Sequence, residues 1–147
     1  MADSGRIEAV CISEKKGEQK HPVEEIRLRP HWGIEGDAHA GDWHRQVSLL
    51  AAESVDRLRE KIALPLPPGV FAENILCRGL CVYQLPVGTR LRVGSALLQV
   101  TQIGKECHAD CAIRRQAGDC VMPREGIFAV VLEEGTARAG EPVEVLG

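Results

Sequence analysis

The fold class of this chain is decided by the stretch RLRVGSALLQV, which covers residues 90–100. On both sides of Gly94 and Ser95, apolar residues recur at every second position, which is the period of a half-buried β-strand. A glycine-containing pair between two such runs is typical of a tight hairpin turn. The stretch therefore predicts two antiparallel strands joined by a short turn.

Short apolar runs of the same kind recur on both sides of this hairpin. Strands are predicted over residues 6–13, 23–29, 47–50, 75–83, 126–132 and 142–146. Between them, the polar residues 14–22 are expected to form a loop or an exposed hairpin tip, and residues 133–141 a turn. Together with the hairpin, these runs predict a mainly β chain of seven or eight short strands.

One segment, residues 51–62, has the spacing of a helix instead. Its apolar residues recur three and four positions apart, and its charged residues lie on the other face. The prolines of the following LPLPPG segment, residues 64–69, are expected to end the helix. The sequence thus predicts one clear helix among the strands.

The composition indicates a single globular domain over residues 1–147. Hydrophobic residues make up 44% of the chain, which suffices for a buried core in a domain of this length. Only 3% of the residues are aromatic, so valine, leucine, isoleucine and alanine must fill that core. The 15 glycines and 8 prolines imply many turns, as a chain of short strands requires.

Charge and apolar patterning exclude several classes of function. The net charge of -3 argues against non-specific electrostatic binding of nucleic acid. No apolar run approaches the roughly 20 residues of a membrane-spanning helix. The N-terminal residues 1–12 do not resemble a secretion signal. We therefore expect a soluble protein of the cytoplasm.

Two long polar loops, residues 33–46 and 104–126, separate these strands. Loops of this length in compact domains are usually functional. The first loop could form a hard-metal site, bind an anion through an arginine and backbone amides, or simply be a solvated loop. Its candidate residues are Glu35, Asp37, His39, Asp42, His44 and Arg45.

The second loop places a thiol beside cations. Lys105 precedes Cys107 and His108 follows it, and nearby cations stabilise the reactive thiolate form of cysteine. A soft sulfur ligand suits zinc, copper or molybdenum. A structural zinc site on Cys107, His108, Cys111 and Cys120 is the weaker alternative, because a second matched pair of ligands is absent. A disulfide between two of these cysteines is a further alternative.

The other candidate residues have both a structural and a functional interpretation. Glu73 and Asn74 follow a proline-rich bend, where they either satisfy a turn or face a ligand. Trp32 and Trp43 flank the first loop and are expected to cover part of the core. The cysteines expected to be buried and inert are Cys11, Cys77 and Cys81.

Taken together, these motifs resemble the MOSC domain family (molybdenum cofactor sulfurase C-terminal domain). The resemblance is carried by GIEGDAHAG (33–41), RQVSLL (45–50), FAENI (71–75), LPVGTRLRVGSALLQVTQIG (85–104) with Cys107, and MPREGIFAVVLEEGTARAG (122–140). It runs over about residues 5–146 and depends on the order and spacing of the motifs. It implies a compact MOSC-type β-barrel with few helices, which agrees with the predicted strands.

The resemblance also implies a role for one thiol. MOSC domains carry a characteristic cysteine just after the strand that corresponds to residues 96–103, which here is Cys107. In relatives that reduce N-hydroxylated compounds, the matching cysteine binds the molybdenum of the pterin cofactor. Other members are viewed as sulfur carriers that hold a persulfide for delivery to metal-sulfur centres.

Two hypotheses about function follow. In the first, the chain binds the molybdenum cofactor, or accepts sulfur on Cys107 from a donor protein, and Lys105 and His108 favour the thiolate. A pterin phosphate would be neutralised by Arg45, Arg114, Arg115 and Arg124, and the pocket would be lined by Asp37, His39, Glu73 and Asn74. In the second, it is a non-catalytic module that recognises a pterin or a partner protein. The enzymatic alternative is a molybdenum-dependent reductase of N-hydroxylated compounds that needs an external electron donor.

Overall fold

The computed structural model describes residues 4–16, 18–104 and 125–146 of the chain, and these residues confirm the mainly β fold class. Eleven strands, one α-helix and one short 3-10 helix lie in these ranges. The first half contains β1 (Ser4–Ile12), β2 (His21–Val23), β3 (Ile26–Arg29), β4 (Gly33–Ile34), β5 (Val47–Ala51) and α1 (Ala52–Arg59). The second half contains β6 (Ile75–Arg78), η1 (Val82–Gln84), β7 (Arg90–Val93), β8 (Ala96–Ile103), β9 (Ile127–Glu133), β10 (Gly135–Ala137) and β11 (Pro142–Val145).

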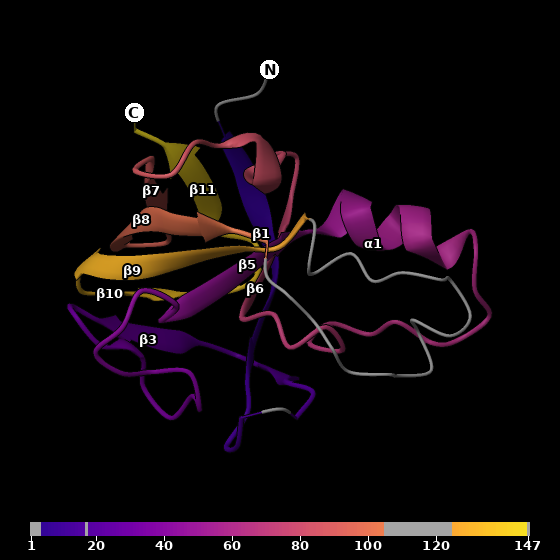
Figure 1. The fold of residues 1–147 in the computed structure, drawn as a ribbon, viewed down its shortest axis with the longest axis horizontal. Coiled ribbons are helices and arrows are strands. Elements are labelled where there is room, and N and C mark those ends of the chain that lie inside the picture. The colour runs from indigo at the N-terminus through magenta and orange to yellow at the C-terminus, as the bar shows by residue number, and fades with distance from the viewer. Residues whose placement is uncertain (1–3, 17, 105–124, 147) are drawn as a thin grey trace.

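Seven strands form a closed barrel (Figure 1). They follow the order β11-β7-β8-β9-β5-β6-β1, and a pairing of β11 with β1 closes the ring. In that closing pair Ser4 lies opposite Glu144, and Arg6 lies opposite Pro142. Neighbouring strands of the barrel are antiparallel except β5 and β6, which run parallel. A parallel pair needs a crossover connection, and α1 lies in that connection.

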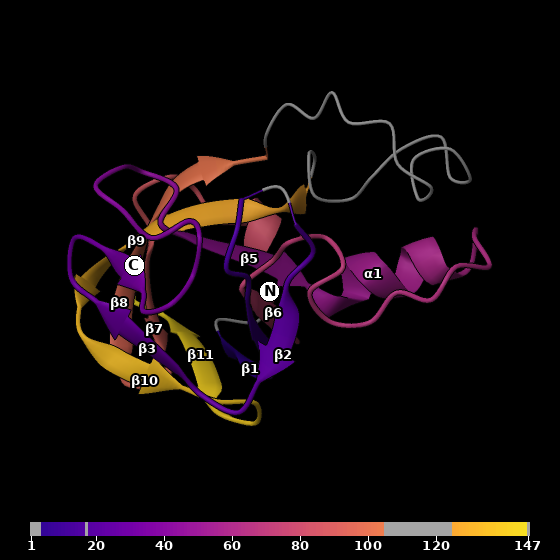
Figure 2. The same cartoon turned by 90° about the horizontal axis from the view of Figure 1, so that it is seen from below.

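A small second sheet of β10, β3 and β4 lies beside the barrel (Figures 1 and 2). Its apolar side chains, among them Leu28, Ile34 and Ala137, belong to the same buried cluster as those inside the barrel. This cluster consists almost wholly of valine, isoleucine, leucine and alanine, as the shortage of aromatic residues predicts. The core is therefore continuous between the two sheets.

A second apolar cluster lies between the outside of the barrel and α1. It joins Val55 and Leu58 of the helix to Leu50, Leu66 and other residues of the barrel wall and connecting segments. The helix ends at Arg59 and is therefore shorter than the predicted 51–62. The Arg59 guanidinium then donates to the Leu66 carbonyl at 2.7 Å, and Leu66 is buried. Burial of Leu66 thus accompanies the end of the helix.

Two local predictions differ from the structure. Residues 14–22 largely form the predicted hairpin tip instead, because β2 begins at His21 and pairs antiparallel with β1, with Ile12 opposite His21. The predicted turn over 133–141 contains β10, which pairs with β3. The predicted strand over 75–83 ends at Arg78, where the next residue, Gly79, has a φ of +92° that ordinary strand residues do not adopt. The partner of β10 lies far away in the sequence, so a local pattern does not reveal this strand.

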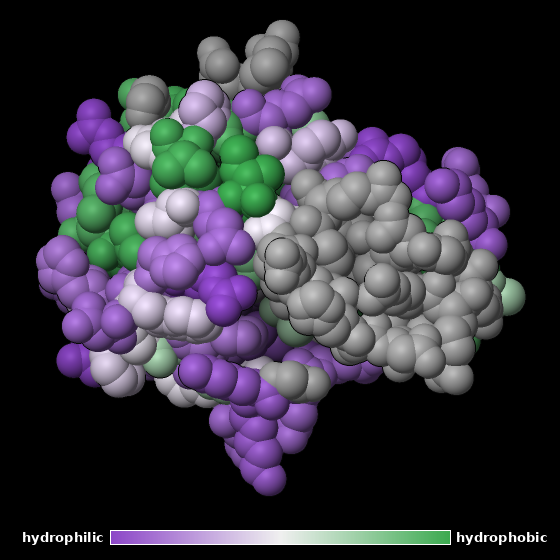
Figure 3. All heavy atoms as spheres, viewed as in Figure 1, coloured by the Kyte–Doolittle hydropathy of each residue, from purple (hydrophilic) through white to green (hydrophobic). Residues whose placement is uncertain are grey.

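The surface of the described residues is mainly polar, with a few exposed apolar side chains. Figure 3 shows mostly hydrophilic residues on the face that it presents, interrupted by small hydrophobic areas. The large apolar side chains that are exposed in the described ranges are Trp32, Val87, Ile103 and Leu146. Among the described residues, no helix is long and apolar enough to cross a membrane.

Candidate functional site

The first polar loop is held in place by the buried carboxylate of Asp37. One oxygen of Asp37 lies 2.7 Å from the ammonium of Lys20, and both side chains are fully buried. The same oxygen accepts a hydrogen bond from the backbone N–H of Ser13 at 3.1 Å, and the other accepts one from the N–H of His39 at 3.1 Å. Asp37 is therefore saturated by protein donors. It positions the loop and does not present a free carboxylate to a ligand.

The bonds of Asp37 hold the loop beside a small pocket. The pocket has a volume of about 260 Å³ and is lined by Lys16, His39, Trp43, Arg45 and Phe128. The indole N–H of Trp43 donates to the His39 carbonyl at 2.8 Å, which fixes the orientation of the ring. The structure thus brings together two of the predicted cofactor-binding residues, His39 and Arg45. We call these five residues the cationic pocket.

The cationic pocket combines positive charge with aromatic faces. The guanidinium carbon of Arg45 lies 4.6 Å from the centre of the Trp43 ring and 5.5 Å from that of Phe128. The ammonium of Lys16 lies 5.0 Å from the centre of the Trp43 ring. Such cation–π contacts hold a cation in place and leave its N–H groups available. No carboxylate is among the described residues that line the pocket.

One buried donor in this pocket has no acceptor among the described residues. The Nε atom of Arg45 is buried and has no hydrogen-bond partner among the described residues. Buried polar atoms are almost always paired, and a guanidinium suits a bidentate oxyanion such as a phosphate. The arrangement therefore favours an anionic ligand.

The cationic pocket lies at the base of the second loop. Phe128 of β9 is paired with Gln102 of β8, and the N–H of Gly104 donates to the carbonyl of Gly126 at 2.6 Å. The first loop is joined to the same end of β8, because His44 Nε2 lies 2.8 Å from the Gln102 side-chain oxygen. Cys107 follows Gly104 by three positions in the sequence.

Several predicted site residues lie outside the described residues. They are Lys105, Cys107, His108, Arg114, Arg115 and Arg124, together with the alternative ligands Cys111 and Cys120. Their assignment as catalytic, metal-binding or phosphate-binding residues stays a prediction. In the described ranges, no three His, Cys, Asp or Glu side chains come close enough to hold a metal ion. The hard-metal interpretation of the first loop therefore has no support from the described residues.

Glu73 and Asn74 are buried beside the barrel wall and make structural hydrogen bonds. The two carboxylate oxygens of Glu73 accept from the N–H groups of Gly69 at 2.7 Å and Phe71 at 3.1 Å. Burial raises the pKa of Glu73 above its usual value, and these hydrogen bonds oppose the rise. The amide of Asn74 accepts from the N–H of Ser48 at 3.0 Å and donates to the Cys11 carbonyl at 3.0 Å. Neither residue lines the cationic pocket.

The described cysteines fall into two groups. Cys11 and Cys77 are fully buried free thiols, as predicted. Burial raises the pKa of each to about 12, and a carboxylate adds to the rise in both cases, Glu73 for Cys11 and Glu53 for Cys77. Both are therefore inert. Cys81 differs from the prediction because it is only partly buried and lines a second, larger pocket.

Three residues of the cationic pocket, Lys16, Trp43 and Phe128, are not among the predicted site residues. Lys16 lies in a segment predicted as a loop or an exposed hairpin tip, and Phe128 lies in a predicted buried strand. Trp43 is predicted only as a cover for the core, but it lines the pocket, and Trp32 is 45% exposed instead of covering the core. No local pattern connects Lys16 with Phe128. Only the tertiary structure shows that they share a site.

The fold is similar to that of several solved structures. The YuaD protein from Bacillus subtilis matches with a TM-score of 0.79 and 18% identity over 97% of this chain and 95% of that chain. YiiM from Geobacillus stearothermophilus matches with a TM-score of 0.72 and 20% identity over 97% and 75%. YiiM from Escherichia coli matches with a TM-score of 0.66 and 23% identity over 97% and 70%. At these identities the likeness concerns the fold alone.

The family is established by sequence. None of the curated proteins matches the chain significantly. The family model of the MOSC domain, however, matches residues 36–144, which is well over half of the chain. This range includes most of the first loop, the barrel strands from β5 to β9, and the segment that carries Cys107. The chain therefore belongs to the MOSC domain family, whose domains are related to the molybdenum cofactor.

Proposed function

We propose that this protein handles the molybdenum cofactor. In this proposal the cationic pocket binds the phosphate of the pterin cofactor, and Cys107 supplies the sulfur that binds molybdenum or carries a sulfur atom. The family relates the chain to this cofactor. The proposed place of action is the cytoplasm, because a reducing compartment preserves the free thiols that this function needs.

The observation that carries the proposal is the buried Nε of Arg45, which has no hydrogen-bond acceptor among the described residues. Arg45 lies on two aromatic rings, with a buried Nε that has no acceptor in the described ranges. Lys16 and His39 line the same space. The pocket of about 260 Å³ has roughly the volume of nine water molecules, so it has room for a phosphate group. Its charge, donors and size therefore fit the anionic end of the cofactor.

Each group has a distinct task in this proposal. Arg45 and Lys16 bind the phosphate oxygens, and the Trp43 ring excludes water from one side of them. Lys105 and His108 favour the thiolate of Cys107. When bound, the cofactor supplies a metal centre that accepts a soft sulfur ligand. Asp37 contributes indirectly, because its bonds to Lys20 and to the loop backbone hold His39 at the pocket.

In the sulfur-carrier form of the proposal, the donor is a protein persulfide. The Cys107 thiolate attacks the outer sulfur of the donor's persulfide and forms a new S–S bond. The sulfur–sulfur bond of the donor breaks, and the donor cysteine leaves as a thiolate that takes up a proton. No further oxidant is needed, because the transferred sulfur is already at the persulfide level.

Elemental analysis tests the proposal. The protein is purified without oxygen from a host that makes molybdenum cofactor, as wild type, Cys107→Ser, Arg45→Gln and the control Arg90→Gln. Arg90 is exposed on β7 and does not line the cationic pocket. We expect near-stoichiometric molybdenum in the wild type and the control, and a much lower content in both other variants. Arg45→Gln loses a charged hydrogen bond, which contributes about 1.5–3 kcal/mol and therefore at least about tenfold in affinity. Cys107→Ser loses the sulfur ligand of the metal.

The outcomes separate the two forms of the proposal. An absence of molybdenum together with an additional sulfur atom on Cys107, seen by intact-mass spectrometry, supports the carrier form. If folded Arg45→Gln retains the molybdenum or sulfur content of the wild type, the cationic pocket is not the cofactor site. If Cys107→Ser retains it, the assignment of Cys107 is wrong.

A further inference from the structure

Strand β8 contains an irregularity where it passes the cationic pocket. Val100 lies opposite Ala129 of β9, and Gln102 lies opposite Phe128, so Thr101 between them has no residue opposite to it. This is the arrangement of a β-bulge, in which two residues of one strand face a single residue of the neighbouring strand. Bulges redirect side chains and are common beside functional sites. Here the bulge places Thr101 and Gln102 together opposite Phe128, which lines the pocket.

Both side chains of the bulge contact His44, the neighbour of Arg45 in the first loop. The Thr101 hydroxyl donates to the His44 carbonyl, and the Gln102 side-chain oxygen lies 2.8 Å from His44 Nε2. Successive side chains of a regular strand point to opposite faces of the sheet, so a strand without the bulge would offer His44 only one of these contacts. The bulge thus attaches both the backbone and the side chain of His44 to β8.

The hydroxyl of Thr101 also joins the two sides of the pocket. Its oxygen lies 3.2 Å from the carbonyl oxygen of Phe128, so one side chain bridges the backbone of the first loop and the backbone of β9. Arg45 lies between these two segments, next to His44 in the sequence and with its guanidinium carbon 5.5 Å from the centre of the Phe128 ring. Thr101 therefore sets the spacing between the guanidinium and this ring.

The backbone is also held on the other side of Arg45. The next residue, Gln46, is buried, and its side-chain oxygen accepts from the N–H of Val131 at 3.0 Å. The Nε atom of Arg45 has no partner among the described residues. The position of the guanidinium therefore depends on its contacts with the rings of Trp43 and Phe128 and on this fixed backbone.

We propose that Thr101 is a positioning residue of the cationic pocket, which holds the Arg45 guanidinium on its two aromatic rings so that its Nε stays available to an anion. Gln102 is a second support of the same loop. The inference rests on the proposed function, because it names the residue that prepares Arg45 for the phosphate. A donor that is already oriented loses less conformational freedom on binding, so the anion is bound more tightly. Thr101 acts only through Arg45, because it does not line the pocket.

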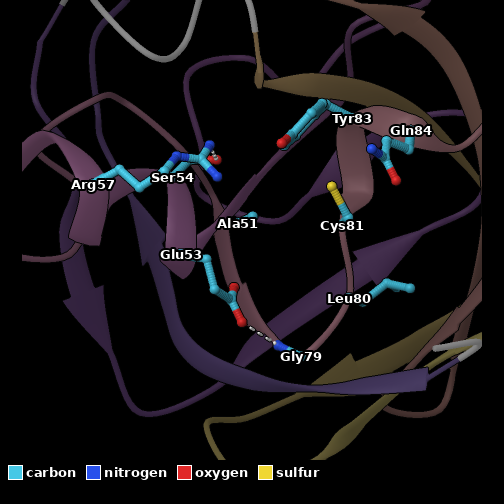
Figure 4. A pocket seen from close by; sticks show the side chains of 9 residues that line it. All are labelled: Ala51, Glu53, Ser54, Arg57, Gly79, Leu80, Cys81, Tyr83 and Gln84. Carbon is cyan, nitrogen blue, oxygen red and sulfur yellow. Dashed lines mark hydrogen bonds between the residues drawn. The ribbon is translucent and has the colours of Figure 1, made fainter. Parts of the chain in front are cut away.

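A larger pocket beside the start of α1 provides a comparison (Figure 4). It also contains a guanidinium, but that of Arg57 is paired with Glu125. Glu53 lines the same pocket and accepts from the N–H of Gly79 at 2.8 Å. Because like charges repel, these carboxylates make the larger pocket unfavourable for an anion. Arg57 therefore serves as the matched control for Arg45.

Titration with inorganic phosphate tests the proposal. The chain has two tryptophans, so a Trp32→Phe background protein reports by fluorescence on Trp43 alone, the ring on which Arg45 lies. The dissociation constant is measured at constant ionic strength in this full-length background. We expect Thr101→Val to weaken phosphate binding roughly two- to tenfold, as the loss of one hydrogen bond implies. Thr101→Ser keeps the hydroxyl and should restore the affinity.

Matched variants separate positioning from a general loss of stability. Gln99→Leu is the control on the same strand, because Gln99 donates to the Gly88 carbonyl at 3.2 Å and does not line the pocket. Gln99→Leu and Arg57→Gln should leave the affinity unchanged, whereas Arg45→Gln should abolish binding. Melting temperatures show which variants are folded.

The fluorescence of Trp43 without phosphate gives a second readout. Thr101→Val should shift the Trp43 emission in the same direction as Arg45→Gln, because both changes weaken the contact between the guanidinium and the indole ring. A variant that is merely less stable but still folded, such as one that melts at a lower temperature, would leave this emission unchanged.

The outcomes distinguish this inference from the proposed function. If Thr101→Val binds phosphate like the background protein, or if Thr101→Ser binds as weakly as Thr101→Val, the positioning role is wrong. Loss of binding in Arg45→Gln alone would then keep the cationic pocket as the anion site. If the background protein binds no phosphate, both the positioning role and the proposed ligand of the pocket are wrong.

A second variant keeps the test decisive if Thr101→Val does not fold. Gln102→Leu removes the contact with the His44 ring, so it should weaken phosphate binding in the same direction. An unchanged affinity in folded Gln102→Leu would then overturn the role of the bulge.

Discussion

Single buried polar residues organise the loops around the barrel. Asp37 and Lys20 lie 17 positions apart in sequence, yet they form a fully buried ion pair that also engages Ser13. Removing one partner of such a pair typically costs about 3–5 kcal/mol, because the other charge is left uncompensated. At residue scale, the carboxylate of Asp37 therefore fixes the shape of the first loop, and the proposed cofactor site depends on the basic and aromatic residues of the cationic pocket.

The buried carboxyl of Glu73 makes stability depend on pH. Since burial raises the pKa of Glu73 in the folded state, the native protein keeps this proton at a pH where the unfolded chain has lost it. The free energy of unfolding should then fall as the pH rises from the unfolded pKa, near 4.3, through the raised folded value. We expect the Glu73→Gln variant to lack this part of the pH dependence.

Urea unfolding of the wild type and of Glu73→Gln, measured between about pH 5 and pH 8, checks this prediction. The free energy of unfolding of the wild type, minus that of Glu73→Gln, should increase as the pH falls. A difference that is constant across this range, or that shifts the other way, would contradict the assigned direction.

At the scale of elements, the hairpin of β7 and β8 depends on its turn. Gly94 has a φ of +57°, and a Cβ atom at this position would lie 2.3 Å from the Thr136 carbonyl oxygen. The turn therefore lies directly against β10 of the small sheet. Glycine is needed there both for the backbone conformation and for the close approach.

Substitution at two glycines separates these effects. Gly88 has a φ of +97°, but a Cβ atom there would meet nothing within 4 Å. We expect Gly88→Ala to lower the free energy of unfolding by about 1–2 kcal/mol, which is the conformational cost alone. Gly94→Ala should cost about 1–3 kcal/mol more, because the methyl group also displaces β10. Chemical denaturation of both variants gives the difference, and equal losses would show that the contact with Thr136 is unimportant.

At the scale of the whole molecule, β11 closes the barrel. It pairs with β7 on one side and with β1 on the other, so it joins residues near the two ends of the chain. Val143 is fully buried in the common core. A closed barrel leaves no sheet edge among its strands, and removal of one strand would expose two.

Truncation tests this role of β11. A chain that ends at Glu141 should lose its cooperative unfolding transition and bind a hydrophobic dye, as expected of a state without fixed packing. A chain that ends at Val145 keeps both pairings and should still unfold cooperatively. Thermal unfolding followed by circular dichroism distinguishes them. A cooperative transition in the shorter chain, at the midpoint of the full chain, would show that closure by β11 does not determine stability.

The sequence by itself determined the mainly β class, most barrel strands and the helix, because alternation, helical spacing and turn residues are local signals. The order and spacing of its motifs predicted the MOSC domain family, which the family model confirms. The tertiary structure alone decided that Asp37 and Asn74 are internal supports, because their partners Lys20, Ser48 and Cys11 lie on other segments. Glu73 differs, because it accepts from the nearby N–H groups of Gly69 and Phe71 in its own turn. The tertiary structure also decided that Lys16 and Phe128 line the same pocket as Arg45, and that Cys81 lines another. Local periodicity specifies which elements form, whereas a site depends on how distant segments pack against each other.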